Sequence, residues 1–490
     1  MIRKIKSICV LGILFIGSAC SSLNFAQPTP QLSETKQALA PNSITPVPTR
    51  PFYKPGELVD YTAQNGDTVP ALAARFNTTV DQIMSANPII PPDATTMPPG
   101  LPMKIPIYYR SLWGTSYQSI PDNAFINGPT LIGFNTSAFV DSHPGWLKGY
   151  VGYAADRYRT GAEIVDYVAS NYSISPRLLL AVLEYQAGAL SQPQQTIKQY
   201  VLGFNREYSS TLYYQLIIAA ETLNNGYYGW RAGNLIEFER TDQTIIRPDP
   251  WLNAGSVAIQ YYFAQLASGP DYDRDVSPNG FAKTYNDLFG NPWTNNSILI
   301  PGSLKQPPML LPFARNQIWT YTGGPHTGWG SGEPFAAIDF GPPSQFHGCF
   351  TPDPQNYVIA VADGLVVRSD INGLVLDLDG DGDERTGWVI FYLHLATATR
   401  ATTGTRLHAG DLIGYPSCQG GETTGTHVHI ARKYNGEWIL ADGATPFNLE
   451  GWITHAGAIA YQGTLTRNGV TVIACACSDF KSQVKSGPTP

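Results

Sequence analysis

The stretch Gly425-Thr426-His427-Val428-His429 determines how the C-terminal part of this chain is interpreted. Alternate residues of a β-strand project from the same face, so the two imidazoles of this stretch are expected to converge on one point. Earlier in the chain, His326 follows a Gly-Gly-Pro run, and Asp339 lies in the hydrophobic strand pattern Ala-Ile-Asp-Phe. Two histidines and one aspartate are the ligand set of an open zinc site, in which three protein ligands leave a position for water.

The first twenty residues indicate export from the cytoplasm. Arg3, Lys4 and Lys6 precede the apolar run 8–16, which is much shorter than the roughly 20 residues of a membrane-spanning helix. This is the pattern of a secretory signal. The small residues before Cys20 resemble the lipobox of bacterial lipoproteins, which implies a lipidated Cys20 and a membrane anchor made of acyl chains. Gly17 stands where that motif usually has Leu, so secretion without an anchor is the alternative.

The charge balance argues against a partner that is recognised through phosphates. The formal net charge of the whole chain is −7, and removal of Arg3, Lys4 and Lys6 with the signal makes it −10 (−7 − 3). An acidic protein of this kind has no electrostatic attraction for nucleic acid. We therefore expect no nucleic-acid partner.

Four cysteines remain after Cys9 is removed with the signal and Cys20 is assigned to lipid, and an oxidising compartment favours disulfides between them. Cys349 and Cys418 flank the suspected site, whereas Cys475 and Cys477 are separated by one residue. We favour a Cys349–Cys418 bridge, with four free thiols as the alternative.

The length of the mature chain predicts several domains. A linker rich in Pro, Thr and Ser gives way to a small αβ pattern, then to helical periodicity, and finally to short strands separated by Gly and Pro turns. The fold class is therefore multidomain: a small βααβ unit, an all-α middle domain and an antiparallel β-sheet domain. The expected boundaries are 1–19 signal, 20–57 linker, 58–107 αβ unit, 110–300 helical domain, 310–447 β domain and 448–490 extension, which has a short strand pair near 458–474 and a disordered tail.

The αβ unit resembles the LysM domain. It has a strand at 59–63, the turn Asn65-Gly66-Asp67-Thr68, two short helices, the second capped by Thr79 with Gln82, and a second strand at 99–106. The resemblance implies binding to the glycan of peptidoglycan. The residues expected to line the glycan groove are Gly66, Asp67, Thr68, Asn87 and Pro88.

Helix starts are expected at Thr160, with Glu163 in a capping box, and at Ser175-Pro176, and further helices at 210–223, 254–266 and 281–288.

The helical domain resembles lysozyme-like lytic transglycosylases around residues 175–188. The catalytic acid of that family corresponds to Gln186, which cannot protonate a glycosidic oxygen. Glu184 projects from the other side of the helix, about 200° away. We therefore interpret the domain as a degenerate glycan-groove or spacer domain rather than as an active transglycosylase.

The β domain closely resembles the lysostaphin and LytM type of zinc metallopeptidase. The resemblance lies in Gly-Gly-Pro-His at 323–326, Ala-Ile-Asp-Phe at 337–340, Tyr-Leu-His at 392–394 and Thr-His-Val-His at 426–429. It implies zinc ligands at His326, Asp339 and His429, and catalytic roles for His394 and His427. The first ligand usually stands four residues before the Asp, where this chain has Phe335; the spacing of His326 is similar to the β-lytic branch. His347 is a rival first ligand.

A further acidic run, residues 377–384, resembles the opening of an EF-hand loop. The twelfth position, where a bidentate Glu is required, is Trp388, so the full loop is absent. A structural calcium site and an acidic hairpin turn are both compatible with this run. The candidate calcium ligands are Asp377, Asp379, Asp381 and Asp383.

Together these features predict a lipid-anchored, zinc-dependent endopeptidase that binds peptidoglycan through its LysM domain and hydrolyses its peptide crosslinks or stems. The alternative is a non-catalytic peptidoglycan-binding lipoprotein that activates or positions another hydrolase. The ligand residues are all present, which favours the enzyme.

Overall fold

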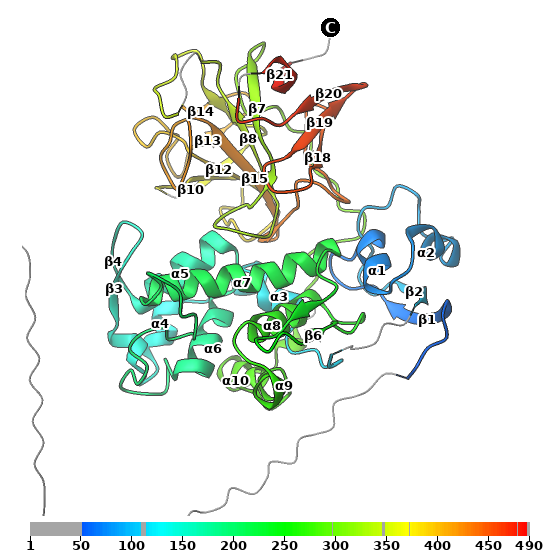
Figure 1. Ribbon diagram of the computed structural model, residues 1–490. Coiled ribbons are helices and arrows are strands. Elements are labelled where there is room, and N and C mark those ends of the chain that lie inside the picture. The colour runs from blue at the N-terminus through cyan, green and yellow to red at the C-terminus, as the bar shows by residue number, and fades with distance from the viewer. Residues whose placement is uncertain are drawn as a thin grey trace, which may run out of the picture. The chain divides into compact units, whose positions relative to one another are not determined.

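The computed structural model of the chain describes residues 51–108, 114–295, 297–344, 348–371, 373–477 and 479–487 (Figure 1). The expected signal peptide, Cys20 and most of the linker lie outside the described residues, as does His347. Within the described ranges, no helix is both long and apolar enough to cross a membrane.

The αβ unit expected at residues 58–107 has the strand and helix order that the sequence predicts. Its two strands pair antiparallel, with Val59 opposite Ile105, and a core that includes Leu72, Phe76 and Ile83 lies between sheet and helices. Thr79 and Gln82 form the expected capping box. The elements are β1 (Glu57–Thr62), α1 (Val69–Arg75), α2 (Val80–Ala86) and β2 (Pro102–Ile107).

The middle region is mainly helical and includes two small hairpins. Thr160 with Glu163 caps α5, and Ser175 caps α6, as the sequence predicts. The elements are α3 (Asp122–Phe125), α4 (Thr136–Asp141), β3 (Val151–Ala154), β4 (Arg157–Thr160), α5 (Gly161–Tyr172), α6 (Pro176–Ala187), α7 (Leu212–Ala232), β5 (Phe238–Glu239), β6 (Ile245–Ile246), α8 (Ala254–Ala264), α9 (Gly269–Asp275) and α10 (Phe281–Phe289), with short 3₁₀ turns at Pro129–Leu131, Trp146–Gly149 and Pro292–Thr294.

Helix α7 is longer than the sequence pattern predicts, because the expected helix ended near Leu223. The helix continues through Gly226 and Gly229 to Ala232. A Cβ at Gly226 would lie 2.8 Å from the Cα of Ala258 in α8, so glycine permits close contact between the two helices. Tertiary packing here outweighs the low helix propensity of glycine.

The C-terminal part of the chain is built on an antiparallel sheet with the order β13-β10-β11-β12-β15-β8-β7-β21, in which β21 is Gln483–Lys485, and β16 pairs with β15. Strands β9 and β14 form a separate two-stranded pair. The strands are β7 (Ile318–His326), β8 (Ala337–Gly341), β9 (Val358–Ile359), β10 (Gly364–Asp370), β11 (Gly373–Asp377), β12 (Trp388–Leu393), β13 (Arg406–Leu407), β14 (Leu412–Gly414), β15 (Val428–Tyr434) and β16 (Glu437–Trp438).

The two faces of this sheet pack against different partners. Ile338, Phe340 and Ile430 belong to a core made of β-domain residues. Ala337 and Ala431 point the other way and belong to a core shared with the helical region. Because strand residues alternate, Asp339 and His429 lie on the same face as Ala337 and Ala431. The face that carries the suspected metal ligands therefore continues into the contact with the helices.

The C-terminal extension is more ordered than the sequence predicts. One strand pair was expected near 458–474, followed by a disordered tail. The structure instead has a four-stranded sheet, and β21 pairs with β7 at the edge of the main sheet. The extension consists of β17 (Asn448–Leu449), β18 (Trp452–Ala456), β19 (Gly463–Arg467), β20 (Val470–Ile473), a 3₁₀ turn at Phe480–Ser482 and β21 (Gln483–Lys485).

A buried arginine connects the three folded regions. The guanidinium of Arg231, in α7, donates to Glu437 of β16 at 2.9 Å and pairs with Asp122 of α3 at 3.0 Å. It also donates to the backbone carbonyl of Asn65 in the αβ unit. All three charged side chains are at least nine-tenths buried. Burial raises the pKa of Glu437 although Arg231 opposes the shift.

Candidate metal centre

Strand register brings the three predicted metal ligands together. His429 of β15 lies directly opposite Asp339 of β8, and β7 on the other side of β8 ends at His326. The ligand atoms form a small triangle: His326 Nε2 lies 3.0 Å from His429 Nδ1, and Asp339 Oδ1 lies 3.3 Å from each of these nitrogens. Tetrahedral coordination with metal–ligand distances of about 2.0–2.1 Å requires ligand separations of about 3.3 Å.

Backbone carbonyls orient both imidazoles toward the centre of this triangle. His326 Nδ1 is 2.8 Å from Gly324 O, and His429 Nε2 is 3.2 Å from Gly328 O. A carbonyl can only accept a hydrogen bond, so these ring nitrogens carry the protons. In the neutral rings, the lone pairs are therefore on the two nitrogens that face the triangle.

Asp339 completes the site with a negative charge. Burial alone would raise the pKa of Asp339, but the neighbouring imidazoles of His326 and His427 hold it well below its usual range. Its Oδ1 atom is buried without a hydrogen-bond partner. A carboxylate oxygen and two imidazole lone pairs, directed at one point and shielded from water, repel one another unless a cation lies between them. The residues therefore fit a tetrahedral divalent metal ion.

His394 and His427 lie beside the triangle. His427 Nε2 is 3.7 Å from Asp339 Oδ2, and the His394 and His427 rings are 4.5 Å apart between centroids. Their Nδ1 atoms lie 3.0 and 2.8 Å from the carbonyls of Gln419 and Gly425. Nε2 of each neutral ring is thus left able to accept a proton. Burial, reinforced by His427 and His429, lowers the pKa of His394 to about 3.

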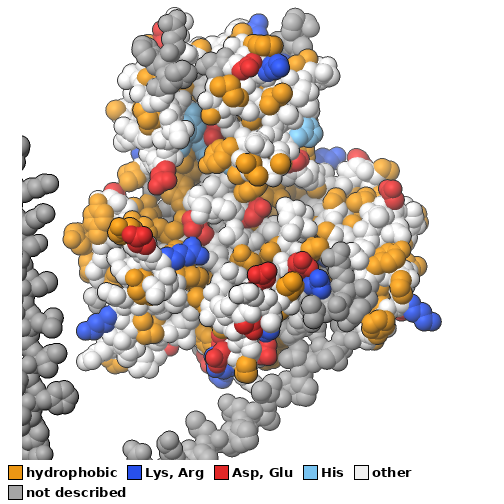
Figure 2. Space-filling model, in the orientation of Figure 1, with side chains coloured by type: hydrophobic (Ala, Val, Ile, Leu, Met, Phe, Trp, Pro, Cys, Tyr) orange, Lys and Arg blue, Asp and Glu red, His pale blue; other side chains and the backbone are white. Residues whose placement is uncertain are grey.

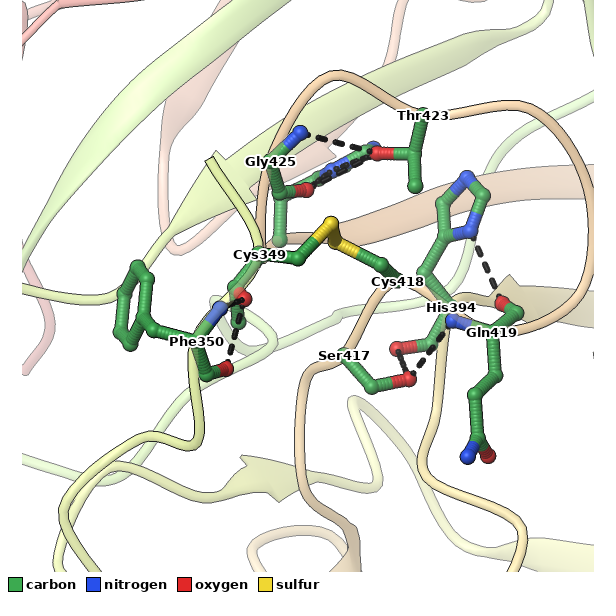
Figure 3. The surroundings of a disulfide bond; sticks show 10 residues. Cys349, Phe350, His394, Ser417, Cys418, Gln419, Thr423 and Gly425 are labelled. Atoms are coloured by element: carbon green, nitrogen blue, oxygen red, sulfur yellow. Dashed lines mark hydrogen bonds between the residues drawn. A yellow bond between two sulfur atoms is a disulfide. The ribbon is translucent and has the colours of Figure 1, made fainter. Parts of the chain in front are cut away.

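The Cys349–Cys418 disulfide that the sequence favoured is present in the structure and holds the loop that orients His394 (Figure 3). Next to Cys418, Gln419 accepts from the His394 ring, and Ser417 donates to the His394 backbone carbonyl. Near Cys349, the Thr426 hydroxyl donates to Phe350 O at 2.7 Å, which fixes the start of β15. A second disulfide joins Cys475 and Cys477.

The sequence interpretation missed several residues around the centre. A Cβ at Gly323 would lie 2.5 Å from Asp339 Oδ2, so the carboxylate position requires glycine there. Tyr461, from the C-terminal extension, stacks on His326 with ring centroids 4.2 Å apart. The Gly323-Gly324 pair could have indicated a close approach of the backbone to the site, whereas no sequence pattern indicates the role of Tyr461.

On the face drawn in Figure 2, histidine reaches the surface only in small patches of the β domain.

The residues expected to bind glycan have structural roles of their own, and glycan binding by them stays a prediction. Gly66 is buried against Arg231, Asp67 is 1% exposed and bonded to Arg75 and Tyr61, and Asn87 ties α2 to β2. Thr68 caps α1, which leaves Pro88 as the exposed member of the set.

Residues 299–304 contact the αβ unit at the turn after β1 and at the later part of the loop between α2 and β2. Leu299 N donates to Asn65 Oδ1, Thr96 Oγ1 donates to Pro301 O, and Thr95 Oγ1 donates to Leu304 O. The chain itself therefore covers this edge.

The acidic run forms the tight turn between β11 and β12. Carboxylate oxygens of Asp377, Asp379 and Asp381 lie close enough together to hold a metal ion. Asp383 instead forms a two-point pair with Arg385, at 2.7 and 2.6 Å. Both oxygens of Asp377 accept backbone amides of the turn. The calcium site stays a prediction, with Asp377, Asp379 and Asp381 as its candidate ligands and Asp383 paired with Arg385 instead.

The side chains at the transglycosylase-like position are engaged in structural hydrogen bonds. Gln186 accepts from Tyr262 at 2.6 Å and donates to Leu202 O. Glu184 accepts the amides of Leu190 and Ser191 after the end of α6. Both side chains stabilise the fold, and Gln186 supplies no acid.

Comparison with known proteins extends over most of the folded chain. Residues 61–106 match the LysM domain, and residues 118–303 match the family described as LasA, N-terminal domain. Protease LasA of Pseudomonas aeruginosa is 24% identical over 320 residues, covering 61% of this chain and 72% of that protein. Beta-lytic metalloendopeptidase of Achromobacter lyticus is 29% identical over 174 residues, which cover 33% of this chain and 43% of that protein.

The chain is thus a metallopeptidase similar to protease LasA and to beta-lytic metalloendopeptidase, with a LysM domain and a helical region that matches the LasA N-terminal domain. The likeness of the helical domain to lytic transglycosylases stays a prediction. Similar solved structures include the M23 metalloprotease pseudoalterin, 24% identical with a TM-score of 0.29, over 34% of this chain and 96% of that one. Another is the catalytic domain of lysostaphin from Staphylococcus simulans, 22% identical with a TM-score of 0.18, over 26% and 90%.

Proposed function

We propose that this protein is a zinc-dependent endopeptidase that hydrolyses peptide crosslinks or stems of peptidoglycan. The observation that carries the proposal is the convergence of His326 Nε2, His429 Nδ1 and Asp339 Oδ1 within 3.3 Å of one another, with both imidazole lone pairs directed inward. Zinc is the metal that this donor set suits best. When bound, it would polarise the scissile carbonyl and activate the attacking water.

The two adjacent histidines would handle the protons. Nε2 of His427 or of His394 takes up the proton of the attacking water and returns it to the leaving amine. The imidazolium formed in this way can donate a hydrogen bond to the oxygen on which negative charge develops. The carbonyls of Gly425 and Gln419 hold these rings in the required tautomer.

The domain order and the N-terminus support the choice of substrate and place of action. A LysM domain ahead of a peptidase fits a target that combines glycan with peptide, and two disulfides fit work outside the cytoplasm. We infer that lipid on Cys20 holds the protein at the membrane surface. Mass spectrometry of Cys20 in the protein purified from membranes tests this part separately.

The test is release of muropeptides with new amino groups from purified peptidoglycan. The zinc-loaded protein lacking residues 1–57 is compared with His429→Ala and His326→Ala, both of which should be inactive. Wild-type protein that binds zinc and sacculi but releases nothing would favour the non-catalytic, activating role. Loss of activity in His429→Ala alone would move the first ligand elsewhere, with His347 as the next candidate.

A further inference from the structure

The loop that connects two of the proposed metal ligands is bound by the helical domain. Residues 327–336 join His326, at the end of β7, to β8, which carries Asp339. Within this loop Gly328 O accepts from His429 Nε2 at 3.2 Å. The loop therefore sets the orientation and the tautomer of the third ligand as well.

Helix α7 holds this loop through two side chains one turn apart. Glu221 Oε1 accepts the Ser331 amide at 3.0 Å, and Asn225 Oδ1 accepts the Glu333 amide at 2.8 Å. Residues four apart lie on the same helix face, so both side chains reach the same loop. A Cβ at Gly332 would lie 2.3 Å from Asn225 Oδ1, which shows how closely the loop approaches α7.

The contact with α7 is transmitted to Gly328 through the loop itself. Gly328 N donates to Pro334 O at 2.9 Å, next to the Glu333 amide that Asn225 binds. On its other side, a Cβ at Gly328 would lie 3.1 Å from the Trp438 ring, so the residue cannot move far in that direction. The Trp438 amide in turn donates to Tyr228 of α7 at 3.0 Å. The Gly328 carbonyl is thus fixed between two contacts with one helix.

We propose that Asn225, assisted by Glu221, is a positioning residue of the metal centre: it holds residues 327–336 so that Gly328 O orients His429. The inference rests on the proposed zinc site and extends it to the helical domain. Contacts beyond the direct ligands commonly change metal affinity by about 10–100-fold when they are lost. Loss of the Asn225 acceptor should weaken zinc binding by about tenfold.

The experiment measures the zinc dissociation constant of the full folded chain by chelator competition, together with hydrogen exchange of the Ser331 and Glu333 amides. Asn225→Ala should bind zinc about tenfold more weakly and exchange these amides faster, whereas Asn225→Asp, which keeps an acceptor oxygen, should restore both. Asn171→Ala is the matched control, because Asn171 Oδ1 accepts from Arg368 between the same two domains at 3.1 Å but away from the loop. If Asn225→Ala does not fold, Glu221→Ala replaces it.

Equal zinc affinity in wild type, Asn225→Ala and Asn171→Ala would overturn the inference. Equal weakening in Asn225→Ala and Asn171→Ala would also overturn it, because the effect would then be general to the domain contact. The zinc-affinity measurement uses no substrate, so its result does not depend on the proposed function. A wild type that binds zinc but cleaves nothing refutes only the proposed function. A wild type that does not retain zinc refutes both.

Discussion

Nε2 of His326 and Nδ1 of His429 lie 3.0 Å apart, and a backbone carbonyl binds the opposite nitrogen of each ring. Neither facing nitrogen carries a proton in the neutral rings, so the pair cannot be a hydrogen bond between neutral imidazoles. The arrangement is stable when a cation lies between the two nitrogens and Asp339. The geometry of the protein alone thus specifies a metal centre, which the comparisons with metallopeptidases support.

Replacement of Gly323 by alanine should damage this centre. The new Cβ would lie 2.5 Å from Asp339 Oδ2 and would displace the carboxylate. We expect zinc affinity to fall by at least about tenfold, measured by chelator competition. Gly149→Ala is the control, because a Cβ at Gly149 meets nothing within 4 Å. Unchanged affinity in Gly323→Ala would show that Asp339 does not need its present position.

Removal of the Cys349–Cys418 disulfide should reduce both stability and catalysis. The bond closes a loop with a sequence separation of 69, and its loss should lower the free energy of unfolding by about 4 kcal/mol in the chain-entropy model. Because Gln419 is then less constrained, the His394 ring loses its fixed orientation, and kcat should fall more than KM rises. The control is loss of the Cys475–Cys477 bond, whose separation is only 2. Equal kcat in the two double Cys→Ser variants would contradict the orienting role.

Arg231→Met should destabilise the contact between the helical and β domains. It leaves the buried carboxylates of Asp122 and Glu437 without their cation, which typically costs about 3–5 kcal/mol. The loss is measured as the change in unfolding free energy in denaturant. A loss below about 1 kcal/mol would mean that water reaches this site.

The stability of the protein should also depend on pH through Glu437. Burial raises the pKa of Glu437 in the folded state above its ordinary value of 4.5, with Arg231 opposing. Above pH 4.5 the folded state therefore binds more protons at this site than the unfolded state, and the stability contribution of Glu437 falls as pH rises through its folded pKa. Arg231→Met removes the opposing charge, so its melting temperature should fall more steeply with pH than that of the wild type. Parallel profiles would contradict this.

Glycan binding by the LysM domain should be limited by residues 299–304. A larger side chain at Gly302 meets Pro98, since a Cβ there would lie 2.5 Å from Pro98 Cγ. Gly302→Val should push the segment off the Asn65 loop and increase binding of the full chain to insoluble peptidoglycan several-fold. Gly149→Ala again serves as the control. Pull-down at equal protein concentration measures the effect, and unchanged binding would mean that glycan uses another surface.

Local sequence patterns predicted which residues converge at the candidate metal centre, because strand alternation and motif spacing are local properties. A strand pattern alone was enough to predict that His427 and His429 share one face. The Cys349–Cys418 pairing was predicted because these two cysteines flank the suspected site. The contributions of Asn225 and Tyr461 could not be predicted, since they depend on contacts between segments far apart in the chain.

Other differences arose where tertiary packing outweighed the local sequence. The helix expected at 210–223 continues through Gly226 in α7, where glycine permits contact with α8. Residues 483–485 belong to the tail that was expected to be disordered, but they pair with β7 and bury Val484 in the β-domain core. Gly66 fits the LysM pattern, yet Arg231 of the helical domain packs against it.

The most direct test of the central claim compares zinc content with cleavage in His394→Ala and His427→Ala. Neither histidine is a proposed ligand, so each variant should keep about one zinc per chain while muropeptide release falls by about 10²–10⁴ relative to wild type. Zinc-loaded wild-type protein that creates no new amino groups in peptidoglycan would contradict the account. So would variants that cleave as fast as the wild type.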